Sequence, residues 1–403
     1  MLETQPGLPL PAVKLALGQP DFLDYRALDP VDAHRLLGEQ VRAQVHHILR
    51  RKIGELTPEA LAQQVRLARY CRGAIRRKLE HSGEEARRAA LEEYVTCLAA
   101  WGQGAELASF DVDGLREVRV DGLPLSATDL AYMLQDDDVG CQTGLWRAAD
   151  GTVFLWHTEE DREPLGARFD RLRLLTFTVS DHGCPTQVFA FLYPDLLPGS
   201  AFAWRSDNYV QAVDSLNLRP QAPESGILAN IATWVTLRLG KSADLDETIR
   251  YLGPFADGYA LNAAYADDGE AFGQKVEFAG TYSHGYRLGD APGSFLYQVN
   301  KFADPNASVA RRYEAVALEK RLRLEERVSR ADSWLRALRP DEADVPAALF
   351  RFLCSREGGD YACANGDVKA YLIAQSAVNR FQISMGAGPA LPGDEPEFFR
   401  FAV

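Results

Sequence analysis

The chain has 403 residues, and because 46% of them are hydrophobic it can bury a sizeable core in one large domain or two ordinary ones. Its formal net charge of -13 argues against a nucleic-acid or lipid-surface binder, since such proteins carry an excess of positive charge. These properties predict a globular protein that acts on a small or neutral partner and binds neither nucleic acid nor a membrane.

Residues 1–109 form the first predicted region, which is helical. Asp29 and Thr57 each precede a proline, as helix N-cap residues often do, and Ser82 is a third candidate cap. Apolar residues follow each of these signals at spacings of three and four. We therefore predict three helices between Asp29 and Trp101.

Basic residues cluster on the outer faces of these helices, at 50–52 and at 72–78. One interpretation is a docking face for an acidic partner such as a carrier protein. The other is a solvated helix face whose bases pair with neighbouring glutamates, and we favour it because that pattern is common on exposed helices.

Residues 110–403 form the second predicted region, in which short β-branched and aromatic runs are separated by Gly, Asp and Pro. The expected strands are 153–157, 172–179, 187–193, 201–205, 209–213, 259–264, 275–278, 295–300, 368–374, 380–385 and 398–402. Helical patterns run from Pro223 to Leu239, follow Ser242, and span about 307–338. Strand runs that alternate with helix pairs favour a layered α+β sandwich over a doubly wound parallel sheet.

The chain shows neither a membrane span nor a secretory signal. No stretch approaches the roughly 20 apolar residues of a membrane helix, so we expect a cytoplasmic protein. Its six cysteines are scattered without a CxxC pair, which predicts neither a disulfide scaffold nor a zinc site. His182 and Cys184 are close in sequence, but Gly and Pro around them predict a turn.

The segment around Cys141 is the most informative. Gly140 and Cys141 begin a predicted strand that turns at Asp150 and Gly151 into a second strand. Three further segments follow in order: 191–204, which contains Leu-Pro-Gly-Ser-Ala-Phe, then Val-Asp-Ser-Leu at 213–216, and Tyr-Gln-Val-Asn-Lys-Phe at 297–302.

These four segments resemble the acyl-coenzyme A:6-aminopenicillanic-acid acyltransferase family of N-terminal nucleophile (Ntn) hydrolases, which includes N-β-alanyl-dopamine hydrolase. The resemblance covers roughly residue 138 to the C-terminus. It implies a four-layer αββα sandwich and a precursor that cleaves itself between Gly140 and Cys141 into two fragments that stay associated. The sequence departs from the family pattern at Gln142, Glu159 and Asp214, which leaves the substrate open.

The chemistry of Cys141 can also be argued without the family. A free thiol near pKa 8.5 supplies only a few per cent of thiolate at neutral pH and needs a base. Cleavage before Cys141 would free an α-amine with a pKa of about 7.7 to 8.0, which could accept the thiol proton. The same sulfur can first attack the carbonyl of Gly140, if a strained turn holds the two close.

The predicted activity is hydrolysis of, or acyl transfer from, a small N-acyl amide or peptide-like metabolite through a thioester on Cys141, without a metal or organic cofactor. The resemblance implies that Asn300 stabilises the oxyanion, a role typically worth about 3 to 4 kcal/mol of barrier. Glu159, with Asp161 as the alternate, is predicted to orient the new amine. The predicted substrate-binding residues are His157, Arg205 and Asn365, with a surface hairpin position as the alternative for Arg205.

Two alternatives remain open. One is a conventional, unprocessed cysteine hydrolase with a histidine base, for which His157, His182 and His284 are the candidates in the second region. The other is a degenerate, non-catalytic family member that binds a partner through its basic helices.

Overall fold

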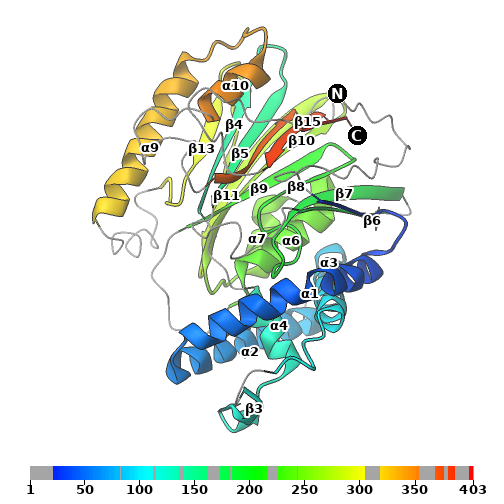
Figure 1. Ribbon diagram of the computed structural model, residues 1–403. Coiled ribbons are helices and arrows are strands. Elements are labelled where there is room, and N and C mark those ends of the chain that lie inside the picture. The colour runs from blue at the N-terminus through cyan, green and yellow to red at the C-terminus, as the bar shows by residue number, and fades with distance from the viewer. Residues whose placement is uncertain are drawn as a thin grey trace.

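The computed structural model describes most of the chain (Figure 1). The described residues are 21–81, 83–111, 115–135, 140–160, 173–181, 184–216, 226–242, 244–304, 318–353, 368–375, 380–385 and 399–402. Asp161, His182 and Asn365, which the sequence analysis singles out, lie outside these ranges. No helix within the described ranges has the length and apolar character that crossing a membrane requires.

The larger sheet has eight strands in the order β1-β6-β7-β8-β9-β10-β11-β12. All neighbours are antiparallel except β1 and β6, which pair in parallel. The strands are β1 (Asp21–Tyr25), β6 (Arg173–Asp181), β7 (Cys184–Leu192), β8 (Phe202–Arg205), β9 (Tyr209–Ser215), β10 (Gly258–Asp267), β11 (Glu270–Ala279) and β12 (Tyr282–Arg287). The sequence analysis missed β1 and β12, the two edge strands, because an edge strand buries little and so lacks a strong apolar pattern.

The second sheet has six antiparallel strands in the order β13-β4-β5-β14-β15-β16. The strands are β13 (Phe295–Gln298), β4 (Gly140–Arg147), β5 (Val153–Glu160), β14 (Val368–Gln375), β15 (Arg380–Met385) and β16 (Phe399–Ala402). A two-stranded hairpin of β2 (Arg119–Val120) and β3 (Leu123–Pro124) stands apart from both sheets.

The helices confirm most of the predicted ones. They are α1 (Pro30–Glu55), α2 (Pro58–His81), α3 (Glu85–Gly104), α4 (Ala127–Leu134), α6 (Ala229–Leu239), α7 (Leu245–Leu252), α9 (Leu318–Ala337) and α10 (Val345–Leu353). Asp29 caps α1 as predicted, because its carboxylate accepts from the backbone N–H groups of Val31 and Asp32. The sequence analysis missed α4 and α10, which are only two to three turns long.

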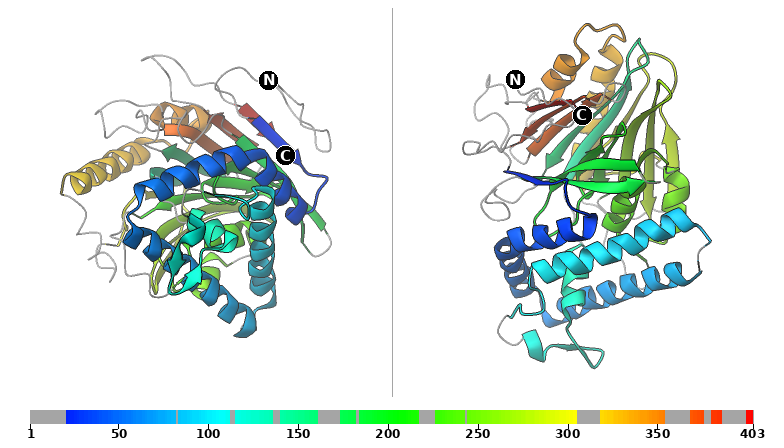
Figure 2. Two further views of the ribbon diagram at one scale, coloured as in Figure 1. Left: turned by 60° about the horizontal axis from the view of Figure 1, so that its bottom comes forward. Right: turned by 90° about the vertical axis from the view of Figure 1, so that its right-hand side faces the viewer.

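Three hydrophobic clusters define how these elements pack. One lies between the sheets and joins residues such as Leu145 and Leu155 of the smaller sheet to Phe191 and Trp204 of the larger sheet. A second joins the larger sheet to α1–α4, α6 and α7, and a third joins the smaller sheet to α9 and α10. Figures 1 and 2 show helices on the outer side of each sheet. The predicted α+β class is thus confirmed.

The N-terminal region is connected to the sheets in two ways. Strand β1 extends the larger sheet through β6, and α3 packs against α6. Several of its basic side chains bind within the chain: Lys78 Nζ donates to the carbonyls of Tyr251 and Gly253 at 2.7 Å, and Lys52 Nζ to that of Met133. These two lysines therefore make structural contacts within the chain, with backbone carbonyls rather than with the neighbouring glutamates that the sequence analysis expects.

Candidate functional site

The β4–β5 hairpin sets which side chains meet between the sheets. Cys141 pairs with Glu159 and Thr143 with His157 in the antiparallel register. Since successive side chains of a strand point to opposite faces, these four share one face. Leu145 lies on the same face of β4 and belongs to the hydrophobic cluster between the sheets, so this face points toward the space between the sheets.

The hairpin turns where the sequence predicts. Gly151 has a φ of 86°, which favours glycine, and Asp150 accepts a hydrogen bond from the N–H of Thr152. The Gly140–Cys141 peptide, however, lies in regular pairing with β5, because Gly140 is opposite Glu160. The strained turn expected at this peptide is therefore not seen: sheet pairing holds both residues extended.

Glu159 is the centre of the site. Its Oε1 lies 3.5 Å from Cys141 Sγ and also accepts from the hydroxyl of Tyr193, which reaches it from the end of β7. Its Oε2 lies 2.8 Å from His157 Nε2. Cys141, His157 and Glu159 have no exposed surface, and Tyr193 is 1% exposed. The structure therefore joins three of the predicted site residues in one buried group.

A second set of contacts runs from His157 to the larger sheet. His157 Nδ1 lies 2.8 Å from Thr143 Oγ1, and both side chains are close enough to Asp214 of β9 to affect its pKa. Asn262 of β10 donates to Asp214 Oδ2 at 2.8 Å. Burial raises the pKa of Asp214 to about 7, against smaller lowering effects of His157 and Thr143. This carboxyl can therefore change its protonation near neutral pH.

The Cys141 thiol is kept neutral in this arrangement. Burial raises the pKa of Cys141 well above its ordinary value, and the negative charges of Glu159, Asp214 and Glu160 add to the effect. A hydrogen bond from the Glu160 backbone acts in the opposite direction but is weaker. The sulfur can therefore become a nucleophile only as its proton moves to a neighbouring group.

Asn300, the predicted oxyanion donor, lies two residues beyond the end of β13. Continuing the register of β13 with β4, which pairs Gln298 with Thr143, would place Asn300 opposite Cys141. Instead, the chain turns at a bridge between Val299 and Lys301, and Asn300 Nδ2 donates to the carbonyl of Ser215 at 2.8 Å. Asn300 is therefore near the strand end that carries Cys141, but its amide is held by β9.

Arg205 is held by other contacts than those of the Cys141 group, and its predicted substrate contact stays a prediction. The side chain is 1% exposed rather than on a surface hairpin, and it forms an ion pair with Asp207 at 2.9 Å. Its Nη1 donates to the carbonyls of Leu237 and Arg238 at the end of α6. These contacts neutralise a helix C-terminus, which is a structural role.

The described histidines of this region do not form a thiol–imidazole pair. Glu159 stands between Cys141 and His157, since it contacts both through different oxygens. His284 is exposed on the edge strand β12, where its ring packs against Tyr286. Among the histidines that the structure describes, none therefore makes the direct contact with Cys141 that the conventional histidine-base alternative requires.

The sequence analysis missed a further buried polar group, which lies on the face of the larger sheet that carries Asn262. Lys275 of β11 is 2% exposed, and its Nζ lies 3.1 Å from Glu277 Oε1 and 2.9 Å from Gln298 Oε1. Thr143, Tyr193 and Asn262 were missed as well. Strand alternation from Cys141 could have indicated Thr143, but the others approach from other strands.

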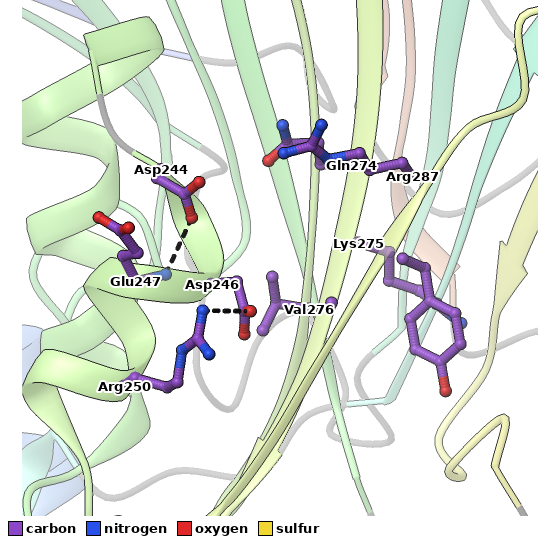
Figure 3. Close-up of a pocket in the computed structure, with 10 residues that line it drawn as sticks. Asp244, Asp246, Glu247, Arg250, Gln274, Lys275, Val276 and Arg287 are labelled. Carbon is purple, nitrogen blue, oxygen red and sulfur yellow. Dashed lines mark hydrogen bonds and ion pairs between the residues drawn. The ribbon is translucent and has the colours of Figure 1, made fainter.

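The structure also contains a cavity of about 190 Å³ between α7 and strands β11 and β12, and Cys141 does not line it (Figure 3). Asp244 faces the helix, where it accepts from the N–H of Glu247, and Asp246 pairs with Arg250 at 2.7 Å. The carboxylates of Asp244 and Asp246 are therefore used in contacts within α7.

Cys141, His157 and Glu159 are also residues of types that bind metals. One ligand atom from each can be chosen so that all three lie within 4.8 Å of one another.

Among known proteins, no family model matches the chain and no curated protein matches it.

Proposed function

We propose that the chain is an Ntn-type cysteine amide hydrolase or acyltransferase that activates itself by cleaving the Gly140–Cys141 bond. The observation that carries the proposal is the contact of Cys141 Sγ with Glu159 Oε1 at 3.5 Å, at the first residues of a central strand. The packing of helices outside two facing sheets is compatible with the αββα sandwich of that class.

Self-cleavage starts with transfer of the thiol proton to Glu159. The sulfur attacks the carbonyl carbon of Gly140, the peptide C–N bond breaks, and the nitrogen of Cys141 takes up the proton as it becomes an amine. Water then hydrolyses the thioester and releases the Gly140 carboxylate. Burial suits this first step, because the reaction is intramolecular and requires no substrate to enter.

For turnover, the freed amine of Cys141 lies on the residue paired with Glu159 and is oriented by that carboxylate. The amine accepts the thiol proton, the sulfur attacks a small N-acyl amide, and the acyl group passes from the thioester to water or to a second amine. Asn262 and Asn300 are buried carboxamides that could stabilise the oxyanion once their present acceptors release them. Cleavage of the Gly140–Cys141 bond would also let a substrate reach Cys141.

The test is intact-mass spectrometry of wild type beside Cys141→Ala and Cys184→Ala. We expect wild type and Cys184→Ala to yield two fragments that meet at Gly140/Cys141, and Cys141→Ala to stay whole. Cys184 is the matched control because it is an exposed free thiol on β7. Incubation with N-acyl amides should then add an acyl mass to the fragment that begins with Cys141. A wild-type chain that remains whole yet hydrolyses amides would support the unprocessed alternative instead.

A further inference from the structure

The buried group at Cys141 has the composition of a zinc site, and one ligand atom from each of its three residues can be chosen so that all lie within 4.8 Å of one another. Thiolate, imidazole and carboxylate are the ligands that Zn²⁺ takes in proteins, and their bond lengths in a tetrahedral site place ligand atoms about 3.3 to 3.6 Å apart. Cys141 Sγ and Glu159 Oε1 are already 3.5 Å apart. His157 Nε2 and Glu159 Oε2, at 2.8 Å, would need to separate by roughly half an ångström.

The contacts around His157 are those of a metal ligand. A zinc-bound histidine almost always donates its second ring N–H to an outer partner, which fixes the ring. Here Thr143 Oγ1 lies 2.8 Å from Nδ1, and a threonine hydroxyl can accept the hydrogen bond from that nitrogen. Nε2 is then the nitrogen that faces Glu159.

His157 Nε2 and Glu159 Oε2 face each other at hydrogen-bond distance, so a cation can bind between them once they separate by the half ångström given above. A metal ion bound there would replace their hydrogen bond and would also draw in the neighbouring sulfur. The sulfur favours Zn²⁺ over Mg²⁺ or Ca²⁺, which prefer oxygen ligands.

We propose that Cys141, His157 and Glu159 bind one Zn²⁺ ion, and that the bound ion prevents the sulfur from attacking Gly140. Binding departs from the sequence prediction of no metal site and is independent of the proposed function. The inhibitory effect rests on the proposed function, since it requires Cys141 to be the nucleophile. Zinc would then hold the precursor uncut until it is removed.

Binding is tested with Co²⁺ as a spectroscopic substitute for Zn²⁺, supplied to the metal-free full chain both after folding and during refolding. We expect one Co²⁺ per chain with a sulfur-to-metal charge-transfer band, displaced by Zn²⁺, in wild type and in Cys184→Ser. Cys141→Ser should lose the band, and Thr143→Val should weaken binding about 10- to 100-fold. Circular dichroism verifies that each variant folds.

A wild-type chain without the band, or a Cys141→Ser chain that keeps it, would overturn the proposed site. The inhibitory effect is read from cleavage of the refolded chain with Zn²⁺ or with a chelator. Cleavage only with the chelator supports inhibition, whereas cleavage at equal rates in both refutes it. If the chain binds metal but is cut in neither condition, the zinc site stands and the proposed self-cleavage fails.

Discussion

Replacing Glu159 with glutamine tests the centre of the site with the smallest change in shape. Glu159 contacts Cys141, Tyr193 and His157 and has no exposed surface. Glutamine keeps the volume but cannot take the thiol proton. Its amide N–H₂ would also face either the Tyr193 hydroxyl or the His157 ring, which now bind an oxygen of Glu159, so one of these hydrogen bonds would be lost.

Two effects follow, of different size. Loss of a positioned general base slows a reaction by about 10²- to 10⁴-fold, or about 3 to 5 kcal/mol of barrier. The mispaired amide costs about 1 to 3 kcal/mol of folding free energy. We therefore expect Glu159→Gln to fold with reduced stability and to cleave itself at least about 100-fold more slowly than wild type.

Glu160→Gln is the matched control. Glu160 is the next residue of β5, is 6% exposed and also carries a carboxylate, but its side chain points to the opposite face. There it accepts from Gln142 at 2.7 Å and pairs with Arg327 of α9 at 3.1 Å. We expect this variant to lose stability while its cleavage rate stays within about tenfold of wild type.

The assay follows the fraction of cut chain by mass spectrometry after refolding is started, and urea unfolding gives the stability of each uncut variant. If Glu159→Gln is cut as fast as wild type, Glu159 is not the base of the first step. If both variants are equally slow, the loss reflects general destabilisation, and the assignment of Glu159 is refuted.

Three further predictions concern stability. Because Asp214 titrates near 7 in the fold and near 3.8 in the unfolded chain, the folded state loses on the order of 4 kcal/mol as pH rises from about 4 to about 7. Asp214→Asn should thus be more stable than wild type above about pH 7, and urea unfolding should show the difference shrink toward pH 4; a constant difference contradicts this. Gly144→Ala should lose about 1 to 3 kcal/mol or more, because a Cβ there would lie 2.2 Å from the Trp156 ring. Gly54→Ala in α1, with no atom within 4 Å of its Cβ, should gain up to about 1 kcal/mol in the same assay, and equal effects at the two glycines would refute the steric argument. Arg205→Lys should lose roughly 1 to 3 kcal/mol, because lysine keeps the charge but not the forked hydrogen bonds, while its folded fraction still cleaves at the wild-type rate; slower cleavage by stable protein would indicate that Arg205 belongs to the site.

The local elements could be predicted well from the sequence. The β15 strand has the predicted bounds, and β5, β8, β14 and β16 agree to within three residues at each end. Asp29 and the Asp150–Gly151 turn were identified because their effects act on backbone groups only a few residues away. The edge strand β1 was missed because its partner β6 is distant in sequence, and the edge strand β12 was missed because its side chains are largely exposed and give no strong apolar pattern.

The sequence by itself also determines that Cys141, His157 and Glu159 lie on one face of the β4–β5 hairpin, because a hairpin with a tight turn fixes both the register and the alternation of side chains. It could not supply the partners from other strands. Tyr193, Asp214 and Asn262 reach the site only because two sheets pack face to face, and Arg205 is held by other contacts because the end of α6 lies beside β8. Contacts within a hairpin depend on short-range geometry, whereas contacts between sheets depend on the burial of the whole core, which only the tertiary structure decides.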